Sequence, residues 1–363
     1  MLKIVLANEN RGRGGAERFT IQLGQALQRV GHQVRLACRQ DSWLARQGLP
    51  FLAIPYRGEI DPASYLAAYQ AMGAAPPHIV HCQATRDLAL FGPLCRLLLR
   101  GASLIKSEHS FLDSAGSAWL RWCYRQCQTV VPVSHALQRQ MQEVLTPNLP
   151  YQVIYNGMDV PPLTQAIPEQ MRDHYWIGYL GSMLESKRVN DVIQACAPLL
   201  RTRPQARLLL AGEGPELLAL QELAQNLEVQ DSIWMPGHID DPLPYLAGLK
   251  VLVQASPRET FSLVALEAMA LEVPVVAYAR EGLAEVVADG QTGLLSSTLE
   301  HQNLTLSIEQ YANKEELRRL HGRNGRLRVQ QNFSWEVILP QWEALYRSLP
   351  TGQAAPQGPT AAH

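Results

Sequence analysis

The repeated alternation of short apolar runs with helical segments constrains the fold of this chain most. Five runs resemble buried strands: LKIVLA (2–7), QVRLAC (33–38), HIVHCQ (78–83), SLIKSEH (103–109) and TVVPVS (129–134). Helical segments lie between most of them; one carries Phe19, Leu23, Leu27 and Val30 at helical spacing. Strands that alternate with helices favour a parallel α/β sheet.

A proline-rich stretch (153–170) interrupts this pattern and predicts a linker. A second alternation starts at WIGYLGSM (176–183) and runs to VPVVAY (273–278). We therefore expect a first Rossmann-like domain over 1–165, with the linker at its end, and a second over 166–332. A last helix is expected over 333–349, and the Pro/Gly/Ala-rich tail (350–363) is expected to be disordered.

The net charge of −1 hides an asymmetry between the two halves of the chain. Residues 1–165 hold 16 Lys and Arg against 10 Asp and Glu, whereas residues 166–363 hold 16 against 23. A basic first half suggests an anionic partner for it. The six scattered cysteines are expected to be buried, reduced thiols, which fits a cytoplasmic location. No apolar stretch approaches the ~20 residues that span a bilayer.

Several marked residues follow predicted strands, where doubly wound sheets bind their ligands. In the first domain they are Gly14, Gly15, His81, Glu108, His109 and Ser134; in the second they are Gly181, Lys187, Gly212, His238 and Glu259.

The segment ETFSLVALEAMA (259–270) places Glu259 and Glu267 eight positions apart around an apolar run. A buried carboxylate needs a partner. Eight helical residues rise ~12 Å, so the spacing suits a molecule with two polar ends better than a metal ion.

Five motifs together resemble the retaining glycosyltransferases of family 4, which have the GT-B architecture. RETFSLVALEAMALEVPVVA resembles their E-x7-E signature. GYLGSMLESKRVNDVI, LLLAGEGP, IYNGMD and the amino-terminal GGAER follow the order and spacing of that family. The resemblance implies two Rossmann-like doubly wound domains that face each other across a cleft. It also implies transfer of a sugar from a nucleoside diphosphate sugar (a UDP- or GDP-sugar), with no metal and no cofactor.

The resemblance also implies roles for particular residues. Glu259 is expected to bind the hydroxyls of the transferred sugar, Glu267 the ribose, Lys187 the diphosphate, and His109 the sugar at the reacting centre. The donor site is expected to include also Gly15, Gly181, Ser182, Gly212, His238, Phe261, Ser262 and Leu263. The start of the helix after Phe261 favours phosphate through its backbone N–H groups.

The acceptor side of the site is less defined by the residues themselves. Gly14, Arg13 and His81 are the residues expected there, and His81 could equally pack in the core. Arg11, Arg13 and Arg18 could attract an anionic acceptor or form a solvated basic loop. The family usually carries an arginine where this chain has Ser182, so Arg188 or Arg258 could supply a second cation.

The expected partners are a nucleotide sugar and a glycan or lipid-linked acceptor of the cell envelope, but no nucleic acid. Trp119, Arg121 and Trp122 on one helix suit an anionic membrane surface, or simply arginine packed on tryptophan. Two alternatives to a glycosyltransferase remain open. One is a sugar-nucleotide 2-epimerase of the same architecture, and the other is a catalytically silent sugar-nucleotide-binding protein.

Overall fold

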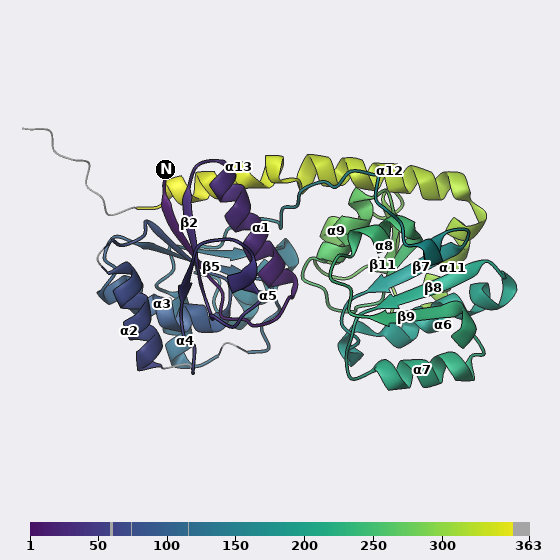
Figure 1. Cartoon of the computed structure of the whole chain (residues 1–363), viewed down its shortest axis with the longest axis horizontal. Helices are drawn as coiled ribbons and strands as arrows, with labels where there is room; N and C mark the ends of the chain where they lie inside the picture. The colour runs from purple at the N-terminus through teal and green to yellow at the C-terminus, as the bar shows by residue number, and fades with distance from the viewer. Residues whose placement is uncertain (59–60, 74, 115, 351–363) are drawn as a thin grey trace, which may run out of the picture. The chain divides into compact units, whose positions relative to one another are not determined.

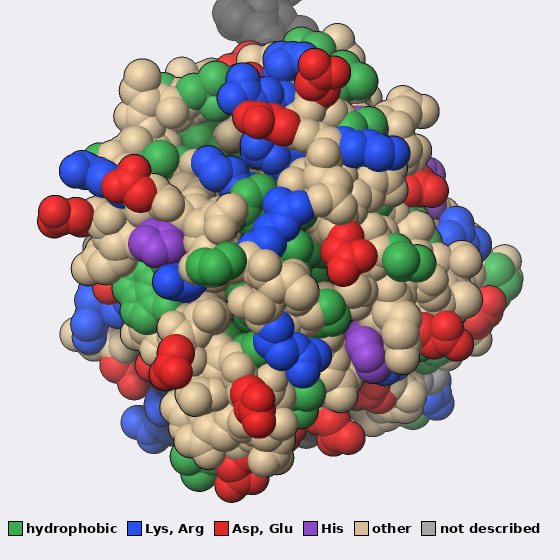
Figure 2. Space-filling view, turned by 90° about the vertical axis from the view of Figure 1, so that its right-hand side faces the viewer, with side chains coloured by type: hydrophobic (Ala, Val, Ile, Leu, Met, Phe, Trp, Pro, Cys, Tyr) green, Lys and Arg blue, Asp and Glu red, His purple; other side chains and the backbone are tan. Residues whose placement is uncertain are grey.

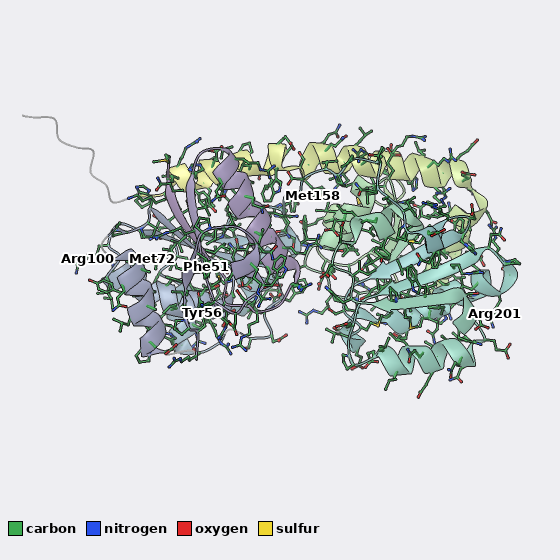
Figure 3. All side chains as sticks on the ribbon, in the orientation of Figure 1. Phe51, Tyr56, Met72, Arg100, Met158 and Arg201 are labelled. Atoms are coloured by element: carbon green, nitrogen blue, oxygen red, sulfur yellow. The ribbon has the colours of Figure 1, made fainter. Side chains whose placement is uncertain are left out.

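The chain divides into two units, each built on a six-stranded parallel sheet (Figure 1). The computed structural model describes residues 1–58, 61–73, 75–114 and 116–350. Unit 1 holds Met1–Met158 and the chain from Trp335 onward, and unit 2 holds Asp159–Ser334. Figure 3 labels Met158, where the first segment of unit 1 ends.

The sheet of unit 1 has the strand order β3-β2-β1-β4-β5-β6. The strands are β1 (Lys3–Ala7), β2 (Gln33–Cys38), β3 (Phe51–Ala53), β4 (Ile79–Cys82), β5 (Ser103–Glu108) and β6 (Thr129–Pro132). The helices are α1 (Gly15–Arg29), α2 (Pro62–Met72), α3 (Thr85–Leu97), α4 (Ala118–Tyr124), α5 (His135–Val144) and α13 (Trp335–Ser348). A 3-10 turn covers Leu44–Arg46. The five predicted strands of this half are confirmed, and the chain reverses its winding direction between β1 and β4.

The sheet of unit 2 has the order β12-β11-β10-β7-β8-β9, which is the same winding in a second copy. Its strands are β7 (Tyr175–Leu180), β8 (Ala206–Ala211), β9 (Ile233–Gly237), β10 (Leu249–Gln254), β11 (Val275–Tyr278) and β12 (Gly293–Ser296). Its helices are α6 (Val189–Thr202), α7 (Leu217–Asn226), α8 (Leu243–Gly248), α9 (Leu263–Ala270), α10 (Leu283–Val286), α11 (His301–Asn313) and α12 (Glu315–Asn332). Short 3-10 turns cover Glu169–Met171, Glu185–Lys187 and Gln230–Ser232. The reversal here falls between β7 and β10.

Helix α13 belongs to unit 1 because its apolar side completes the core there. Trp335, Trp342 and Tyr346 are each at most 3% exposed, and the rings of Phe19 and Trp335 lie 6.1 Å apart. The backbone N–H of Trp335 donates to the carbonyl of Met158 at 3.1 Å. Each such aromatic side chain buries ~150–250 Å², so this helix is a large part of the core of unit 1.

The unit boundaries differ from those expected from the sequence. The proline-rich linker was expected to end the first domain at 165, but unit 2 already begins at Asp159. The expected last helix (333–349) begins two residues late, at Trp335. Apart from Pro350, the predicted disordered tail (350–363) lies outside the described residues.

Surface charge and cysteine burial follow simple patterns. On the face drawn in Figure 2, acidic and basic side chains are interspersed, without a patch of one sign. The six cysteines are buried and free, as predicted. Within the described part of the chain, no helix is long and apolar enough to cross a membrane.

Candidate functional site

The loops after β7 and β10 flank the point where the sheet of unit 2 reverses its winding. In open α/β sheets this is where ligands bind, beyond the carboxyl ends of the strands. Lys187 ends the 3-10 turn after β7, and Glu259 lies in the loop after β10. The Lys187 Nζ donates to Glu259 Oε2 at 2.7 Å. The structure therefore brings together two residues that are 72 positions apart in the sequence.

This ion pair is partly open to solvent. The side chains of Lys187 and Glu259 are 28% and 17% exposed. Solvent-exposed ion pairs stabilise a fold by only ~0–1 kcal/mol, so we expect this pair to contribute little to the stability of unit 2. A ligand can therefore reach both side chains from solvent. The ammonium group of Lys187 could contact a phosphate, and the carboxylate of Glu259 could contact a hydroxyl group.

The glycine loop that precedes Lys187 is fixed by close backbone contacts. Gly212 has φ +142°, and a Cβ atom there would lie 1.8 Å from the carbonyl oxygen of Gly181. Only glycine fits such an approach. The Tyr179 hydroxyl donates to the carbonyl of the next loop residue, Ser182, at 2.8 Å, while Ser182 itself is exposed. The ends of β7 and β8 are thus held together beneath the loop that carries Lys187.

Arg188, which could have replaced the missing family arginine, is already engaged. Its guanidinium lies 2.8 Å from the carboxylate of Asp191, which is 2% exposed, and it donates to the carbonyl of Leu299 at 3.2 Å. Its carbon also lies 5.6 Å from the ring centre of Tyr278. These contacts hold Arg188 on the body of unit 2.

Helix α9 begins four residues after Glu259, and its N-terminal cap is strained. Ser262 has φ 76°, and its hydroxyl accepts from the N–H of Ala265 at 3.3 Å. A non-glycine residue in this region costs about 1–3 kcal/mol, and such residues gather at functional sites. Leu263 opens the helix, and Glu267 within it is 5% exposed. Phe261 is 2% exposed, with its ring 5.7 Å from that of Phe333, so its side chain packs in the core of unit 2.

His238 follows a different strand of the unit 2 sheet. It follows β9, which is the edge strand of the sheet, whereas Lys187 and Glu259 follow the central strands β7 and β10. Its side chain is 48% exposed and lies 3.5 Å from Asp240. The place of His238 in the donor site stays a prediction.

In unit 1, His109 follows β5 and rests on a buried polar network. Its Nε2 lies 2.9 Å from Gln83 Oε1. Lys106, which is fully buried, donates to the carbonyl of Gln83 at 3.1 Å and lies 3.0 Å from Glu108. Tyr124 donates to Glu108 at 2.8 Å. Burial and the charge of Lys106 lower the pKa of His109 to about 3, so the ring is neutral near pH 7.

The remaining predicted residues of unit 1 divide into core and surface. His81 is fully buried between Tyr346 Oη, at 2.9 Å, and Ser107 Oγ, at 2.7 Å, which agrees with the packing alternative. Gly14 caps α1, Gly15 is its first residue, and both are exposed. Arg13 is exposed in the loop before them.

Sequence reasoning missed the two residues that support His109. Gln83 and Lys106 lie at or near strand ends. A lysine inside the apolar run SLIKSEH indicates a buried charge that needs polar partners, and this signal could have identified the network. Among the described residues, no group of three or more His, Cys, Asp or Glu could hold a metal ion.

Comparison with known proteins agrees with this architecture. Residues 166–328 match the family "Glycosyl transferases group 1", and residues 13–160 match "Glycosyltransferase Family 4". The chain is 32% identical over 234 residues to the N-acetyl-alpha-D-glucosaminyl L-malate synthase of Bacillus anthracis. The matched segment covers 62% of this chain and 61% of that protein. It is 28% identical over 192 residues to the capsular polysaccharide biosynthesis glycosyltransferase CapM of Staphylococcus aureus, which covers 53% and 50%.

A solved structure shows the same fold over almost the whole chain. Anabaena Alr3699/HepE, crystallised with UDP and glucose, superposes with a TM-score of 0.82 at 20% identity and covers 96% of this chain and 100% of that one. The matches to the two curated relatives span about half to six-tenths of their length. With two family models that together match most of its length, this chain belongs to the GT-B glycosyltransferases of the family 4 type.

Proposed function

We propose that the protein transfers a sugar from a UDP- or GDP-sugar to a glycan or lipid-linked acceptor of the cell envelope, with retention at the anomeric carbon and without a metal. The observation that carries the proposal is the Lys187–Glu259 pair beside the start of α9. A relative named for capsular polysaccharide biosynthesis supports the choice of acceptor class.

Lys187 suits the leaving group of this reaction. When the bond between the anomeric carbon and the β-phosphate oxygen breaks, its electron pair stays on the phosphate, which gains negative charge. A fixed ammonium group stabilises that charge more in the transition state than in the bound donor. The bond to Glu259 holds the ammonium in place before the donor arrives.

Glu259 and Glu267 suit the two hydroxyl-bearing ends of the donor. A carboxylate accepts two or more hydrogen bonds, so Glu259 can hold Lys187 and a sugar hydroxyl at once. Glu267, at 5% exposure, would bind the ribose. The N–H groups that open α9 lie between the two in the sequence and favour phosphate. In front-face attack, the acceptor hydroxyl enters on the side that the phosphate leaves, and its proton passes to that phosphate.

The test is a panel of UDP-, GDP-, ADP- and CMP-sugars with the wild-type protein, followed by thermal shift and by slow hydrolysis of the donor. We expect one UDP- or GDP-sugar to raise the melting temperature and to be hydrolysed. An epimerase would instead convert the sugar without an acceptor and incorporate deuterium from heavy water. A thermal shift without any turnover would indicate a silent binding protein, and silence across the panel would contradict the proposal.

We also propose peripheral attachment of unit 1 to an anionic membrane. Trp119 and Trp122 stack with ring centres 5.1 Å apart on α4, and Trp119 is 38% exposed. Residues 1–165 carry a net charge of +6. Each basic residue near an anionic surface contributes ~1 kcal/mol, so binding should weaken with salt. Failure to co-sediment with phosphatidylserine vesicles at low salt would contradict this attachment.

A further inference from the structure

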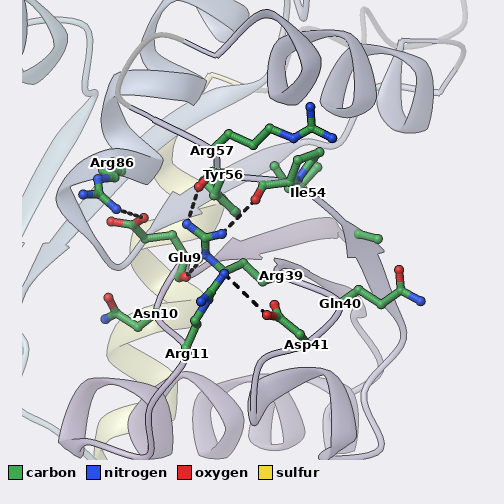
Figure 4. A pocket seen from close by; sticks show the side chains of 12 residues that line it. Glu9, Asn10, Arg11, Arg39, Gln40, Asp41, Ile54, Tyr56, Arg57 and Arg86 are labelled. Carbon is green, nitrogen blue, oxygen red and sulfur yellow. Dashed lines mark hydrogen bonds and ion pairs between the residues drawn. The ribbon is translucent and has the colours of Figure 1, made fainter.

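A hollow in unit 1 gathers arginines that the donor chemistry does not use (Figure 4). It has a volume of about 1160 Å³ and lies beyond the carboxyl ends of β1, β2 and β3. Its lining includes Arg11, Arg39, Arg57 and Arg86, with Glu9 and Asp41 as the acidic side chains. Four guanidinium groups against two carboxylates leave the hollow with a net positive charge.

Arg39 is a preorganised cation in this hollow. Its guanidinium donates to the carbonyls of Glu9 at 3.1 Å, of Pro55 at 2.9 Å, and of Tyr56. These acceptors are neutral carbonyls, so they fix the position of the guanidinium without neutralising its charge. A guanidinium has five N–H donors, and three are used here. The side chain lies over the ring of Tyr56, 5.8 Å from its centre.

The segment that Arg39 contacts, which includes Tyr56, is also held in a defined shape. Tyr56 has φ 47°, which is strained for a residue with a side chain. Its N–H donates to Ser64 Oγ at 2.8 Å, and the N–H of Arg57 donates to Asp61 at 3.0 Å. The backbone that presents the Arg57 side chain is therefore fixed, although the side chain itself is exposed.

Each of the two carboxylates of the hollow forms an ion pair with an arginine. Arg86 lies 3.2 Å from Glu9, and Arg11 lies 3.5 Å from Asp41, with the side chains of Arg11 and Asp41 more than 60% exposed. The Arg11–Asp41 pair is screened by water, so Arg11 can exchange Asp41 for another anion. In the other pair, Arg86 is 49% exposed although Glu9 is only 11% exposed. Figure 4 shows Arg39 between these two pairs.

We infer that this hollow binds the anionic group, a phosphate or a carboxylate, of the acceptor. The inference rests on the proposed transferase function and adds the chemical class of its acceptor. Guanidinium groups bind both anions through paired N–H donors. A volume of about 1160 Å³ exceeds the need of one small anion and leaves room for the glycan or polyol that bears it. Of the three basic loop residues singled out in the sequence, only Arg11 lines the hollow.

The binding test uses inorganic phosphate as the probe, titrated into the wild-type protein and three variants by calorimetry at low salt. Arg57→Gln and Arg86→Gln should each weaken binding roughly tenfold, the value for a lost hydrogen bond to a charged group. Arg100→Gln is the matched control, because Arg100 is exposed in unit 1 and lies away from Tyr56 (Figure 3). Phosphate binding that is absent, or that all three variants weaken equally, would overturn the inference.

The acceptor test compares glucose, glucuronate and glucose 6-phosphate as acceptors for the wild-type protein, with the donor found in the panel. We expect the two anionic acceptors, glucuronate and glucose 6-phosphate, to be preferred over glucose. A preference for glucuronate would indicate a carboxylate site, and a preference for glucose 6-phosphate would indicate a phosphate site. Equal use of all three, with donor hydrolysis intact, overturns this inference and leaves the transferase function standing. Specific phosphate binding without hydrolysis of any donor would instead support an anion site and contradict the transferase function.

Discussion

Lys187 Nζ and Glu259 Oε2 lie 2.7 Å apart at the winding reversal of the second sheet. The pair joins the loops after two adjacent strands, β7 and β10. The loop after β7 carries two cations, Lys187 and Arg188. Arg188 is paired with the buried Asp191, whereas Lys187 is paired with the partly exposed Glu259. In the proposed reaction, the pair therefore links the cation that would stabilise the leaving group to the carboxylate that would bind the sugar.

Lys187→Ala should lower turnover roughly 10²–10³-fold, the usual loss for a preorganised group that stabilises transition-state charge. The melting temperature should stay near that of the wild type, because an exposed pair contributes only ~0–1 kcal/mol. Turnover beside a melting curve measures both. Lys314→Ala, an exposed lysine between α11 and α12, is the matched control. Normal turnover in Lys187→Ala would assign the leaving-group charge to Arg258 or another cation.

Lys187 and Glu259 should act as one unit in catalysis. Glu259→Gln is expected to lower kcat more than it raises KM, because its bonds tighten as charge develops on the sugar. In the double variant with Lys187→Ala, the combined loss should be clearly smaller than the product of the two single losses, since each change disrupts the same pair. Strictly multiplicative losses would show that the two residues work independently.

Glu267→Gln should chiefly weaken donor binding. Loss of a hydrogen bond to a charged group costs ~1–3 kcal/mol, so KM for the donor should rise about tenfold or more while kcat changes little. The amide keeps the size of the side chain, which is 5% exposed, so the core is not emptied. A large fall in kcat at unchanged KM would mean that the two glutamates have been assigned to the wrong ends of the donor.

His109 should not titrate in the working range of the enzyme. Its pKa in the folded protein is about 3, below the ordinary value of 6.5. Between these two pH values, His109 therefore binds a proton in the unfolded chain but not in the folded protein. Stability from this residue is therefore complete above about pH 6.5 and declines as the pH falls towards 3. The stability difference between wild type and His109→Gln, measured from melting curves between pH 4 and 8, should shrink on acidification. A constant difference would contradict the lowered pKa.

Activity should survive EDTA. The helix terminus and Lys187 can neutralise the diphosphate, and no described group of acidic or histidine side chains is arranged to hold a metal. Assays with excess EDTA, and with EDTA plus Mn²⁺ as the control, should give equal rates. Loss of activity that Mn²⁺ restores would overturn the metal-independent mechanism.

The sequence predicted the main strands well because each is a short, mostly apolar run that alternates with a helical segment. It did not assign β3, which has only three residues, two of them exposed, and therefore no readable period. Helix α2 and residues 283–332, which form α10, β12, α11 and α12, were also left unassigned. It predicted Lys187 and Glu259 as site residues but not their ion pair, because the pairing depends on the path of two loops. The same applies to Arg39, whose backbone partners no side-chain pattern reveals.

The most direct test of the proposed reaction is the configuration of the first product. Proton NMR should follow the anomeric signal while the wild-type protein, in EDTA, transfers or hydrolyses its α-linked donor. The account predicts that the α-anomer appears first and mutarotates only later. A β-anomer as the first product would contradict retention, and with it the front-face mechanism proposed for the Lys187–Glu259 site.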